Sequence, residues 1–299
     1  MNFKPIELED KPVFDLAFRR RYYENSWFTF TNLLVWRNNY STSWAVQDDS
    51  LYVRLQANGL IYFLPAFTPP GKSFAQAVDA AVTESLSRGE TFLMKGLSPA
   101  MCAEVQEMWP DRFLMEPQRD YFDYLYRAED LRTLAGRKYH SKRNFVNRFR
   151  SEHADWQYEP LTTDSGEDCL QVAAAWCENR DCDASAVLGN EYRAIEEALQ
   201  HFDLLGLRGG IIRLNGRPVA FSFGEALNTD TMVIHMEKAD PAVQGLYAMI
   251  NQECCRQAWG DVEFINREED MGEEGLRKAK DSYYPVRLVE KHKLYLREG

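Results

Sequence analysis

Three stretches of this sequence concentrate the residue types that proton transfer or phosphate binding requires. The first, residues 137–150, holds six lysines and arginines and no acidic residue. On a helix, its apolar and basic residues fall largely on different faces, with Phe145, Val146 and Phe149 on one and Lys138, Lys142 and Arg143 on the other. A solvated basic face would account for this pattern. Because the surrounding chain is acidic and gathering like charges costs self-repulsion, a binding site for a polyanion accounts for it equally well.

The second stretch, residues 233–248, is predicted to run from a strand through a short loop into a helix that begins near Gly245. A glycine at this point allows backbone N–H groups to approach an anion at the positive end of the helix. His235 and Glu237 share one face of the strand, because side chains alternate with a period of two. Either could act as a general base, although a single histidine in a strand more often has a structural role.

The third stretch, residues 264–285, leads from an apolar strand into a dense polar cluster, the place where function collects in open α/β sheets. Asn266 and Arg267 follow the strand, and Lys278 and Lys280 lie on the predicted helix that comes next. A network of caps and salt bridges at the start of that helix would explain the acidic residues. It explains Asn266 and the closely spaced basic residues less well, so we expect these to take part in binding.

A further segment, residues 66–73, nearly matches a phosphate-binding loop of the Walker A type between a strand and a helix. Such loops bind phosphate with backbone N–H groups, and Pro69 and Pro70 have none. We interpret the segment as a stiff turn before Ser73, which is expected to cap the helix.

The elements that must position these residues follow from periodicity and turn signals. In the first half we expect helices over 10–27, 32–39, 73–87 and 98–109, a hairpin of strands 42–46 and 51–55, and strands over 60–67, 91–94, 113–115 and 121–126. In the second half we expect helices over 131–150, 168–179, 191–204, 245–259 and 274–281, and strands over 210–214, 218–225, 231–237, 262–265 and 286–296. The two halves carry a similar order of elements, which predicts two domains, 1–129 and 130–299.

Composition limits the class of protein. The 299 residues are 45% hydrophobic and 27% charged, which excludes collagen-like and wholly disordered chains. The net charge of −11 disfavours a general nucleic-acid coat, but it allows one phosphate-bearing ligand in a basic cleft. No signal peptide or apolar stretch of about 20 residues is present, so we expect a soluble cytoplasmic protein without a transmembrane segment. The six cysteines are expected to be reduced core residues, and no metal site is predicted.

Four segments together resemble one protein family. They are Lys138–Asn144, His235–Asp240, Ile265–Gly272 and Gly275–Tyr283. They are similar to the soluble bacterial proteins related to the C-terminal domain of phosphatidylglycerol lysyltransferase. The resemblance implies an α+β or α/β architecture of two tandem GNAT-like lobes, each a mixed twisted sheet flanked by helices, as in the Fem peptidyltransferases.

Relatives of this architecture transfer an amino acid from aminoacyl-tRNA to a lipid headgroup or a peptidoglycan amine. Two departures from the resemblance bear on the substrate. The segment 244–248 has only a compressed version of the loop with which GNAT acetyltransferases bind the CoA pyrophosphate, which argues against acetyl-CoA. The large membrane domain of the lysyltransferase has no counterpart in the sequence, which argues against direct action on lipid.

The first hypothesis is therefore an acyl- or aminoacyltransferase that uses a phosphate-bearing donor, aminoacyl-tRNA or acyl-CoA, and a small amine, peptide or lipid headgroup as acceptor. Glu237 or His235 would be the base, and backbone N–H groups near Gly245 would face the oxyanion. The donor's phosphates would be held by Lys138, Lys142, Arg143, Asn266, Arg267, Lys278 and Lys280. Two alternatives stay open: an acetyl-CoA-dependent N-acetyltransferase, and an anion-binding module without catalysis.

Overall fold

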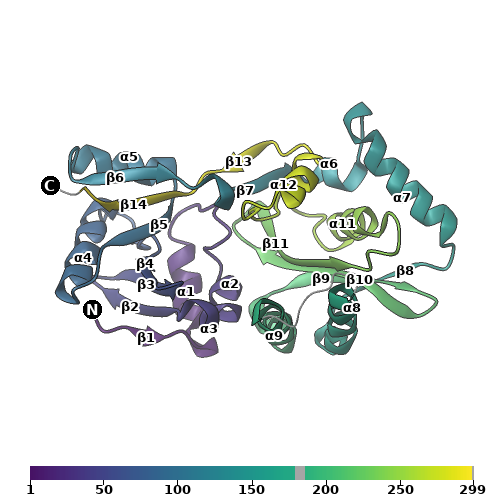
Figure 1. The fold of residues 1–299 in the computed structure, drawn as a ribbon, viewed down its shortest axis with the longest axis horizontal. Coiled ribbons are helices and arrows are strands. Elements are labelled where there is room, and N and C mark those ends of the chain that lie inside the picture. The colour runs from purple at the N-terminus through teal and green to yellow at the C-terminus, as the bar shows by residue number, and fades with distance from the viewer. Residues whose placement is uncertain (179–185, 298–299) are drawn as a thin grey trace. The chain divides into compact units, whose positions relative to one another are not determined.

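The computed structural model describes residues 1–178 and 186–297. Within this part the chain forms two compact units (Figure 1). The first unit comprises residues 1–123, 269–274 and 288–299, and the second comprises 124–268 and 275–287. The chain thus leaves the second unit near its C-terminus and completes the first, a return that the similar order of elements in the two halves did not predict.

A seven-stranded sheet forms the centre of the first unit. In spatial order its strands are β1 (Lys4–Pro5), β2 (Ser43–Gln47), β3 (Ser50–Ala57), β4 (Leu60–Phe63), β5 (Leu93–Leu97), β14 (His292–Leu296) and β6 (Phe113–Pro117). Neighbouring strands are antiparallel except β4 and β5. The hairpin of β2 and β3 is confirmed, and the C-terminal strand β14 lies inside the sheet.

Five α-helices accompany this sheet in the described residues: α1 (Lys11–Phe18), α2 (Phe30–Val35), α3 (Arg37–Tyr40), α4 (Phe74–Ser87) and α5 (Pro99–Met108). The expected helix over 10–27 is wrong beyond Phe18. The following segment instead makes tertiary hydrogen bonds, because Arg20 Nη1 donates to the Phe67 carbonyl at 2.9 Å and Asn25 Nδ2 to the Gly96 carbonyl at 3.0 Å. These distant partners outweigh the helical periodicity of the segment.

The turn before α4 has the structural role that its prolines indicate. Ser73 is the N-cap, and its Oγ accepts a hydrogen bond from the Gln76 N–H at 3.3 Å. The carboxylate of Glu104 accepts another from the Phe74 N–H at 2.7 Å. The positive end of the helix is therefore already occupied by a carboxylate of the same unit.

The second unit is built on a second seven-stranded sheet. In spatial order its strands are β13 (Arg287–Val289), β7 (Asp123–Arg127), β12 (Phe264–Asn266), β11 (Thr231–Ala239), β10 (Arg217–Ala226), β9 (Arg208–Leu214) and β8 (Gln157–Pro160). The β11–β12 pair is parallel, whereas β7 with β12, β11 with β10, β10 with β9 and β9 with β8 are antiparallel. The predicted strand over 286–296 is wrong as one element, because it divides into β13 and β14, which belong to different sheets.

The α-helices described for this part of the chain are α6 (Ala128–Thr133), α7 (His140–Glu152), α8 (Gly166–Glu178), α9 (Ala186–Gln200), α10 (Phe202–Leu205), α11 (Leu246–Gln257) and α12 (Glu274–Asp281). Helices α6, α7 and α11 lie over one face of the second sheet, and α8 and α9 over the other (Figure 1). Both faces of β10 are covered in this way, and eight of its ten residues are buried.

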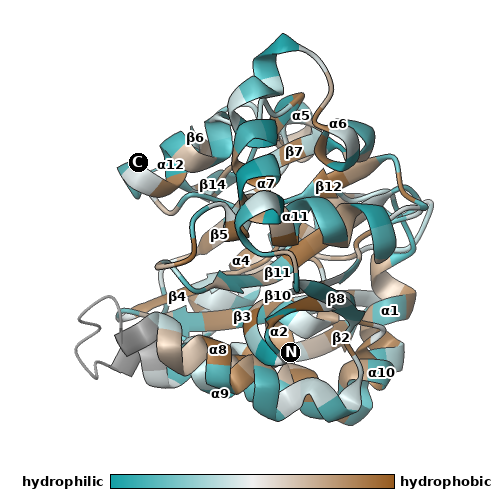
Figure 2. Cartoon of the chain, turned by 90° about the vertical axis from the view of Figure 1, so that its right-hand side faces the viewer, coloured by the Kyte–Doolittle hydropathy of each residue, from teal (hydrophilic) through white to brown (hydrophobic). Residues whose placement is uncertain are grey.

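One predicted helix in this unit is wrong as a single element. The helix expected over 131–150 is broken between α6 and α7, where Leu134 and Gly136 have positive φ angles of 49° and 84°. Helix α7 itself is hydrophilic along most of its length (Figure 2). It carries the basic stretch that the sequence singled out.

None of the described helices is long and apolar enough to cross a membrane. Four cysteines in the described residues, Cys102, Cys169, Cys254 and Cys255, are free thiols. Cys177 and Cys182 belong to the same prediction of reduced core cysteines, and their side chains lie outside the described residues.

Candidate functional site

The parallel strands β11 and β12 of the second unit stay paired over only three residues each. Thr231–Val233 of β11 pairs with Phe264–Asn266 of β12. Beyond this point β11 continues to Ala239, whereas the segment after β12 turns away from it at Arg267. Charged side chains from both segments meet beyond this point. This cluster lies where two parallel strands diverge, which is the position at which α/β proteins commonly bind their ligands.

A bulge in β11 aims one of the predicted residues into the cluster. Phe223 of β10 lies opposite Met236, but the next residue, Gly224, lies opposite Ile234, so His235 has no partner on β10. Gly224 permits this close approach, since a Cβ on it would overlap the Val233 carbonyl oxygen. Bulges beside active sites commonly re-aim a side chain in this way.

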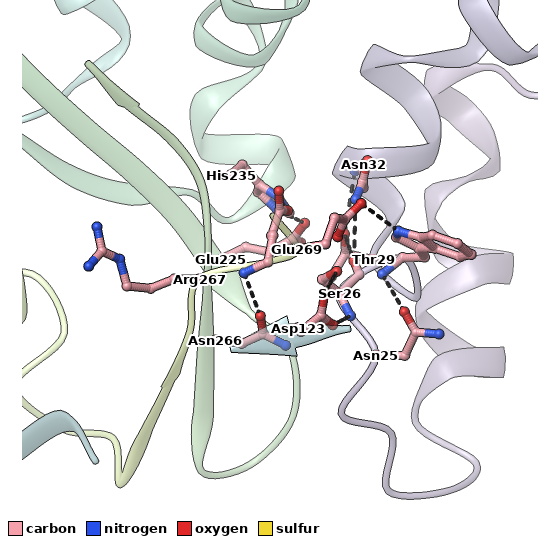
Figure 3. A network of polar contacts seen from close by, with 12 residues as sticks. Asn25, Ser26, Thr29, Asn32, Asp123, Glu225, His235, Asn266, Arg267 and Glu269 are labelled. Carbon is pink, nitrogen blue, oxygen red and sulfur yellow. Dashed lines mark hydrogen bonds and ion pairs between the residues drawn. The ribbon is translucent and has the colours of Figure 1, made fainter. Parts of the chain in front are cut away.

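His235 is held between two carboxylates (Figure 3). Its Nε2 lies 2.9 Å from Glu225 Oε1 and its Nδ1 lies 3.0 Å from Glu268 Oε1, and its side chain is only 6% exposed. Burial by itself would lower the pKa of the imidazole, but hydrogen bonds to Glu225 and Glu268 outweigh burial and raise the pKa of His235 to about 9. The side chain is therefore an imidazolium at neutral pH, with both nitrogens donating.

Glu268 occupies a strained backbone conformation that several contacts enforce. Its φ is 55°, a region that residues other than glycine rarely adopt. Its N–H donates to Asn266 Oδ1 at 2.8 Å, and its carbonyl accepts from Lys280 Nζ at 3.0 Å and from the Tyr124 N–H at 3.2 Å. Lys280 Nζ also donates to the Arg267 carbonyl at 2.5 Å. Strain that its surroundings determine so fully is characteristic of functional sites.

Glu237, the second predicted residue on β11, forms an ion pair with Arg267, which directly follows β12. Its Oε1 accepts from Arg267 Nη2 at 2.8 Å, and its Oε2 accepts from Asn251 Nδ2 of α11 at 3.1 Å. Two polar atoms beside this pair, Arg267 Nη1 and Asn251 Oδ1, are buried and have no hydrogen-bond partner among the described residues. Arg267 Nη1 can therefore still donate a hydrogen bond, and Asn251 Oδ1 can still accept one.

A second cation lies beside Arg267. Lys142 Nζ is 4.0 Å from the ring centre of Tyr283, and the guanidinium carbon of Arg267 is 4.9 Å from the same ring. Burial, and after it the charge of Arg267, lowers the pKa of Lys142 to about 8. Lys142 has no carboxylate partner within the described part of the chain. Two cations that share one aromatic ring without a second counter-charge are suited to bind an oxyanion.

Most other basic residues of the 137–150 stretch have partners within the second unit. Lys138 pairs with Asp130 at 3.2 Å, and Arg143 Nη1 donates to the Gly136 carbonyl at 2.7 Å and to the Leu134 carbonyl. Arg148 and Arg150 pair with Glu152 and Glu253 at 2.7 and 2.8 Å. Lys138 and Arg143 thus fasten α6 to α7, and Lys278 is exposed on α12.

Gly245 has a packing role in the structure. Its φ is 84°, and a Cβ on it would overlap the Phe145 carbonyl oxygen of α7. The space beside the first turn of α11 is therefore filled by the backbone of α7. The predicted approach of an anion to Gly245 receives no support from this arrangement.

The structure thus brings together six of the predicted residues, namely Lys142, His235, Glu237, Asn266, Arg267 and Lys280. Sequence reasoning missed Glu225, Asn251, Glu268 and Tyr283. Glu225 is at the end of an apolar strand and Asn251 is within a helix, so no spacing connects either residue with β11. Glu268 was interpreted with the neighbouring acids as a helix cap, although the Asn266-Arg267-Glu268 sequence is compatible with the observed turn.

The first unit contains a buried ionic cluster of its own, of which Figure 3 labels Ser26, Asp123 and Glu269. Lys291 is completely buried, and its Nζ donates to Asp123 at 2.6 Å, to Glu269 at 3.1 Å and to Ser26 Oγ at 3.1 Å. Glu269 also accepts from Trp27 Nε1 at 3.1 Å. Burial raises the pKa of Asp123 above its usual range, and the charge of Lys291 opposes this. The cluster ties the returning C-terminal segment to the N-terminal part of the unit.

The two units define a tandem GNAT-like fold, in which each unit is a mixed sheet flanked by helices. Residues 19–295 match the family model described as "Phosphatidylglycerol lysyltransferase, C-terminal". The chain belongs to this family, which is one of transferases of the acyl or aminoacyl kind. A search of curated protein sequences gives no match.

Solved structures agree with this family. A conserved protein of unknown function from Bacteroides thetaiotaomicron is 38% identical, with a TM-score of 0.93 over 99% of this chain and 100% of that one. L-PGS from Bacillus licheniformis is 13% identical, with a TM-score of 0.62 over 85% of this chain and 83% of that one. FemX is 9% identical, with a TM-score of 0.61 over 99% and 98%. The last two likenesses concern the fold.

Proposed function

We propose that the second unit transfers an aminoacyl group from a phosphate-bearing donor, of the aminoacyl-tRNA type, to an amine or hydroxyl acceptor. The observation that carries the proposal is the charged cluster where β11 and β12 diverge. It combines an imidazolium, carboxylates and two cations with two buried polar atoms, Arg267 Nη1 and Asn251 Oδ1, that have no partner in the part of the chain that the structure describes. This cluster lies in a chain whose family is named for a lysyltransferase.

Arg267 and Lys142 are the groups of the cluster that fit an oxyanion. Among the described residues, neither Arg267 Nη1 nor Lys142 Nζ has a hydrogen-bond acceptor. A phosphate or carboxylate of the donor would satisfy both cations with charge-assisted hydrogen bonds. Asn266 and Lys280 hold this arrangement through the backbone. Asn266 Oδ1 accepts from the Glu268 N–H, and Lys280 Nζ donates to the Arg267 carbonyl.

Aminoacyl-tRNA suits the site better than acetyl-CoA. CoA enzymes of the GNAT class bind pyrophosphate at the turn before the helix that corresponds to α11, as the resemblance implies. In this chain that turn is packed against α7 at Gly245. The family name points to a lysyl donor and a lipid acceptor, and the resemblance to the Fem peptidyltransferases implies a peptidoglycan amine as the other acceptor class.

The proposal is tested by incubating the whole chain with radiolabelled lysyl-, alanyl- or seryl-tRNA in separate arms. Each arm receives phosphatidylglycerol vesicles, a peptidoglycan stem peptide or a small diamine, and a parallel arm receives acetyl-CoA with the same acceptors. We expect label to move from one of the tRNAs to one acceptor, and Arg267→Met to lower that rate by about 100-fold or more. The control is Arg217→Met, which removes an exposed arginine paired with Asp240.

Binding of tRNA without turnover in every arm would contradict the proposal and favour a binding module. Acetyl transfer without aminoacyl transfer would favour the acetyltransferase alternative.

A further inference from the structure

The cluster contains three carboxylates and one histidine that could take a proton, and their contacts differ. We propose that Glu268 accepts the proton of the attacking amine or hydroxyl, and that His235 is a positioning residue that holds the Glu268 carboxylate. This inference rests on the proposed transfer reaction, and it names a residue that the strand pattern of the sequence did not identify.

Glu237 and His235 are poorly placed for this task. Both oxygens of Glu237 accept hydrogen bonds, one from Arg267 and one from Asn251, and its side chain is only 12% exposed. His235 donates from both ring nitrogens to carboxylates. A base needs a lone pair within reach of the substrate, and His235 at neutral pH has none.

Glu225 and Glu268 share the imidazolium but differ in access. The side chain of Glu225 is 10% exposed at the end of β10, whereas that of Glu268 is 25% exposed. Glu268 uses Oε1 to bind His235, and its Oε2 accepts no hydrogen bond from the described residues. Glu225 likewise uses only Oε1, and its Oε2 accepts no hydrogen bond from the described residues, so exposure decides between the two carboxylates. Glu268 is the one that a substrate reaches more readily.

The backbone of Glu268 is the second, independent observation. Its positive φ is maintained by hydrogen bonds from Lys280 and Tyr124 to its carbonyl and from its own N–H to Asn266. Four residues thus fix one side chain, if His235 is included. Such placement is what general-base catalysis needs, because the proton acceptor must lie within about 3 Å of the reacting atom.

The proton balance of the step is complete. The nitrogen or oxygen of the acceptor forms a bond to the carbonyl carbon of the aminoacyl ester, and its proton passes to Glu268 Oε2. The ester C–O bond then breaks, and the same proton passes from Glu268 to the departing ribose oxygen. His235 stays protonated throughout and neither gains nor loses a proton.

The test compares Glu268→Gln, Glu268→Gly and Glu237→Gln in the transfer assay, with Glu152→Gln on the exposed surface of α7 as the control. Glycine suits the positive φ, so Glu268→Gly is a second variant that keeps the fold if glutamine disturbs it. We expect a loss of kcat of about 100-fold to 10,000-fold for both Glu268 variants. We also expect added formate to restore part of the rate of Glu268→Gly, because formate can supply the missing carboxylate.

Two results would overturn the inference: Glu268→Gln within about threefold of the wild-type rate, or no gain in the rate of Glu268→Gly when formate is added. If the wild-type chain transfers no aminoacyl group in any arm, the proposed function fails. If it does transfer and Glu268 is dispensable, only the role of Glu268 fails.

Discussion

Replacing Lys291 by methionine should destabilise the first unit, and the size of the effect should depend on pH. Lys291 is completely buried and is shared by Asp123 at 2.6 Å and Glu269 at 3.1 Å. Methionine fills the volume but removes the cation that the buried Asp123 and the half-buried Glu269 share. Removing one partner of a buried ion pair costs about 3–5 kcal/mol, which is a large part of the stability of an ordinary domain.

The pH dependence follows from the carboxyl pKa. Burial already raises the pKa of Asp123 above its unfolded value, and loss of Lys291 would raise it further. A carboxyl whose pKa is higher in the folded state binds more protons there, so folding stability falls as pH rises through that pKa. The variant should therefore lose about 3–5 kcal/mol at pH 8 and clearly less at pH 5, where one carboxyl is protonated.

Urea unfolding at both pH values, followed by tryptophan fluorescence, measures this loss. Trp27 reports on the cluster directly, because its Nε1 donates to Glu269 and Lys291 Nζ lies 4.3 Å from its ring centre. The control is Lys293→Met on β14, which removes a partly exposed pair with Glu116 and should cost about 1 kcal/mol at most. Equal losses for the two variants, or a loss at Lys291 that is the same at both pH values, would refute the reasoning.

Three further predictions concern the second unit. Gly245→Ala should lower the free energy of unfolding in urea by about 1–3 kcal/mol more than Gly206→Ala does. Both glycines have a positive φ, but only Gly245 lies against α7. Equal losses for the two variants would contradict the packing role of Gly245. In an NMR titration the imidazole of His235 should titrate near pH 9. Its contribution to folding stability is therefore complete below about pH 6.5, the pKa of an unfolded histidine, and is lost as the pH rises through 9. A midpoint near 6.5 would show that Glu225 and Glu268 do not hold the imidazolium. With limiting acetic anhydride at pH 8, Lys142 should be acetylated ahead of lysines of ordinary pKa, because about half of the Lys142 amines are neutral at that pH. Added sulfate should protect Lys142 from acetylation. Equal acetylation of all lysines in mass spectrometry would argue against the oxyanion site.

Local signals predicted much of the fold. The Asn215-Gly216 turn has two positive φ angles, 50° and 76°, and joins β9 and β10 as the sequence indicates. The helix over 274–281 and the Ser73 cap are also confirmed. Errors arose where distant partners decide the conformation, as in the segment after Phe18. The place of β14 in the first sheet depends on pairing with β5 and β6, which spacing along the chain does not encode.

The candidate site was predictable only in part, for a related reason. The period of two places His235 and Glu237 on one face of β11, and both are less buried than the residues between and beside them. The residues that control His235 come from β10 and from the turn after β12. Their proximity depends on a bulge and on strand order, neither of which has a signature in the sequence.

We propose above that the cluster between β11 and β12 carries out acyl transfer. The most direct measurement is kcat/KM for transfer of a radiolabelled aminoacyl group from tRNA by the wild-type chain and by Arg267→Met, with Arg217→Met alongside. We predict measurable transfer by the wild type, a loss of about 100-fold or more in Arg267→Met, and little change in Arg217→Met. Transfer that survives in Arg267→Met, or no transfer by the wild-type chain, would contradict the claim.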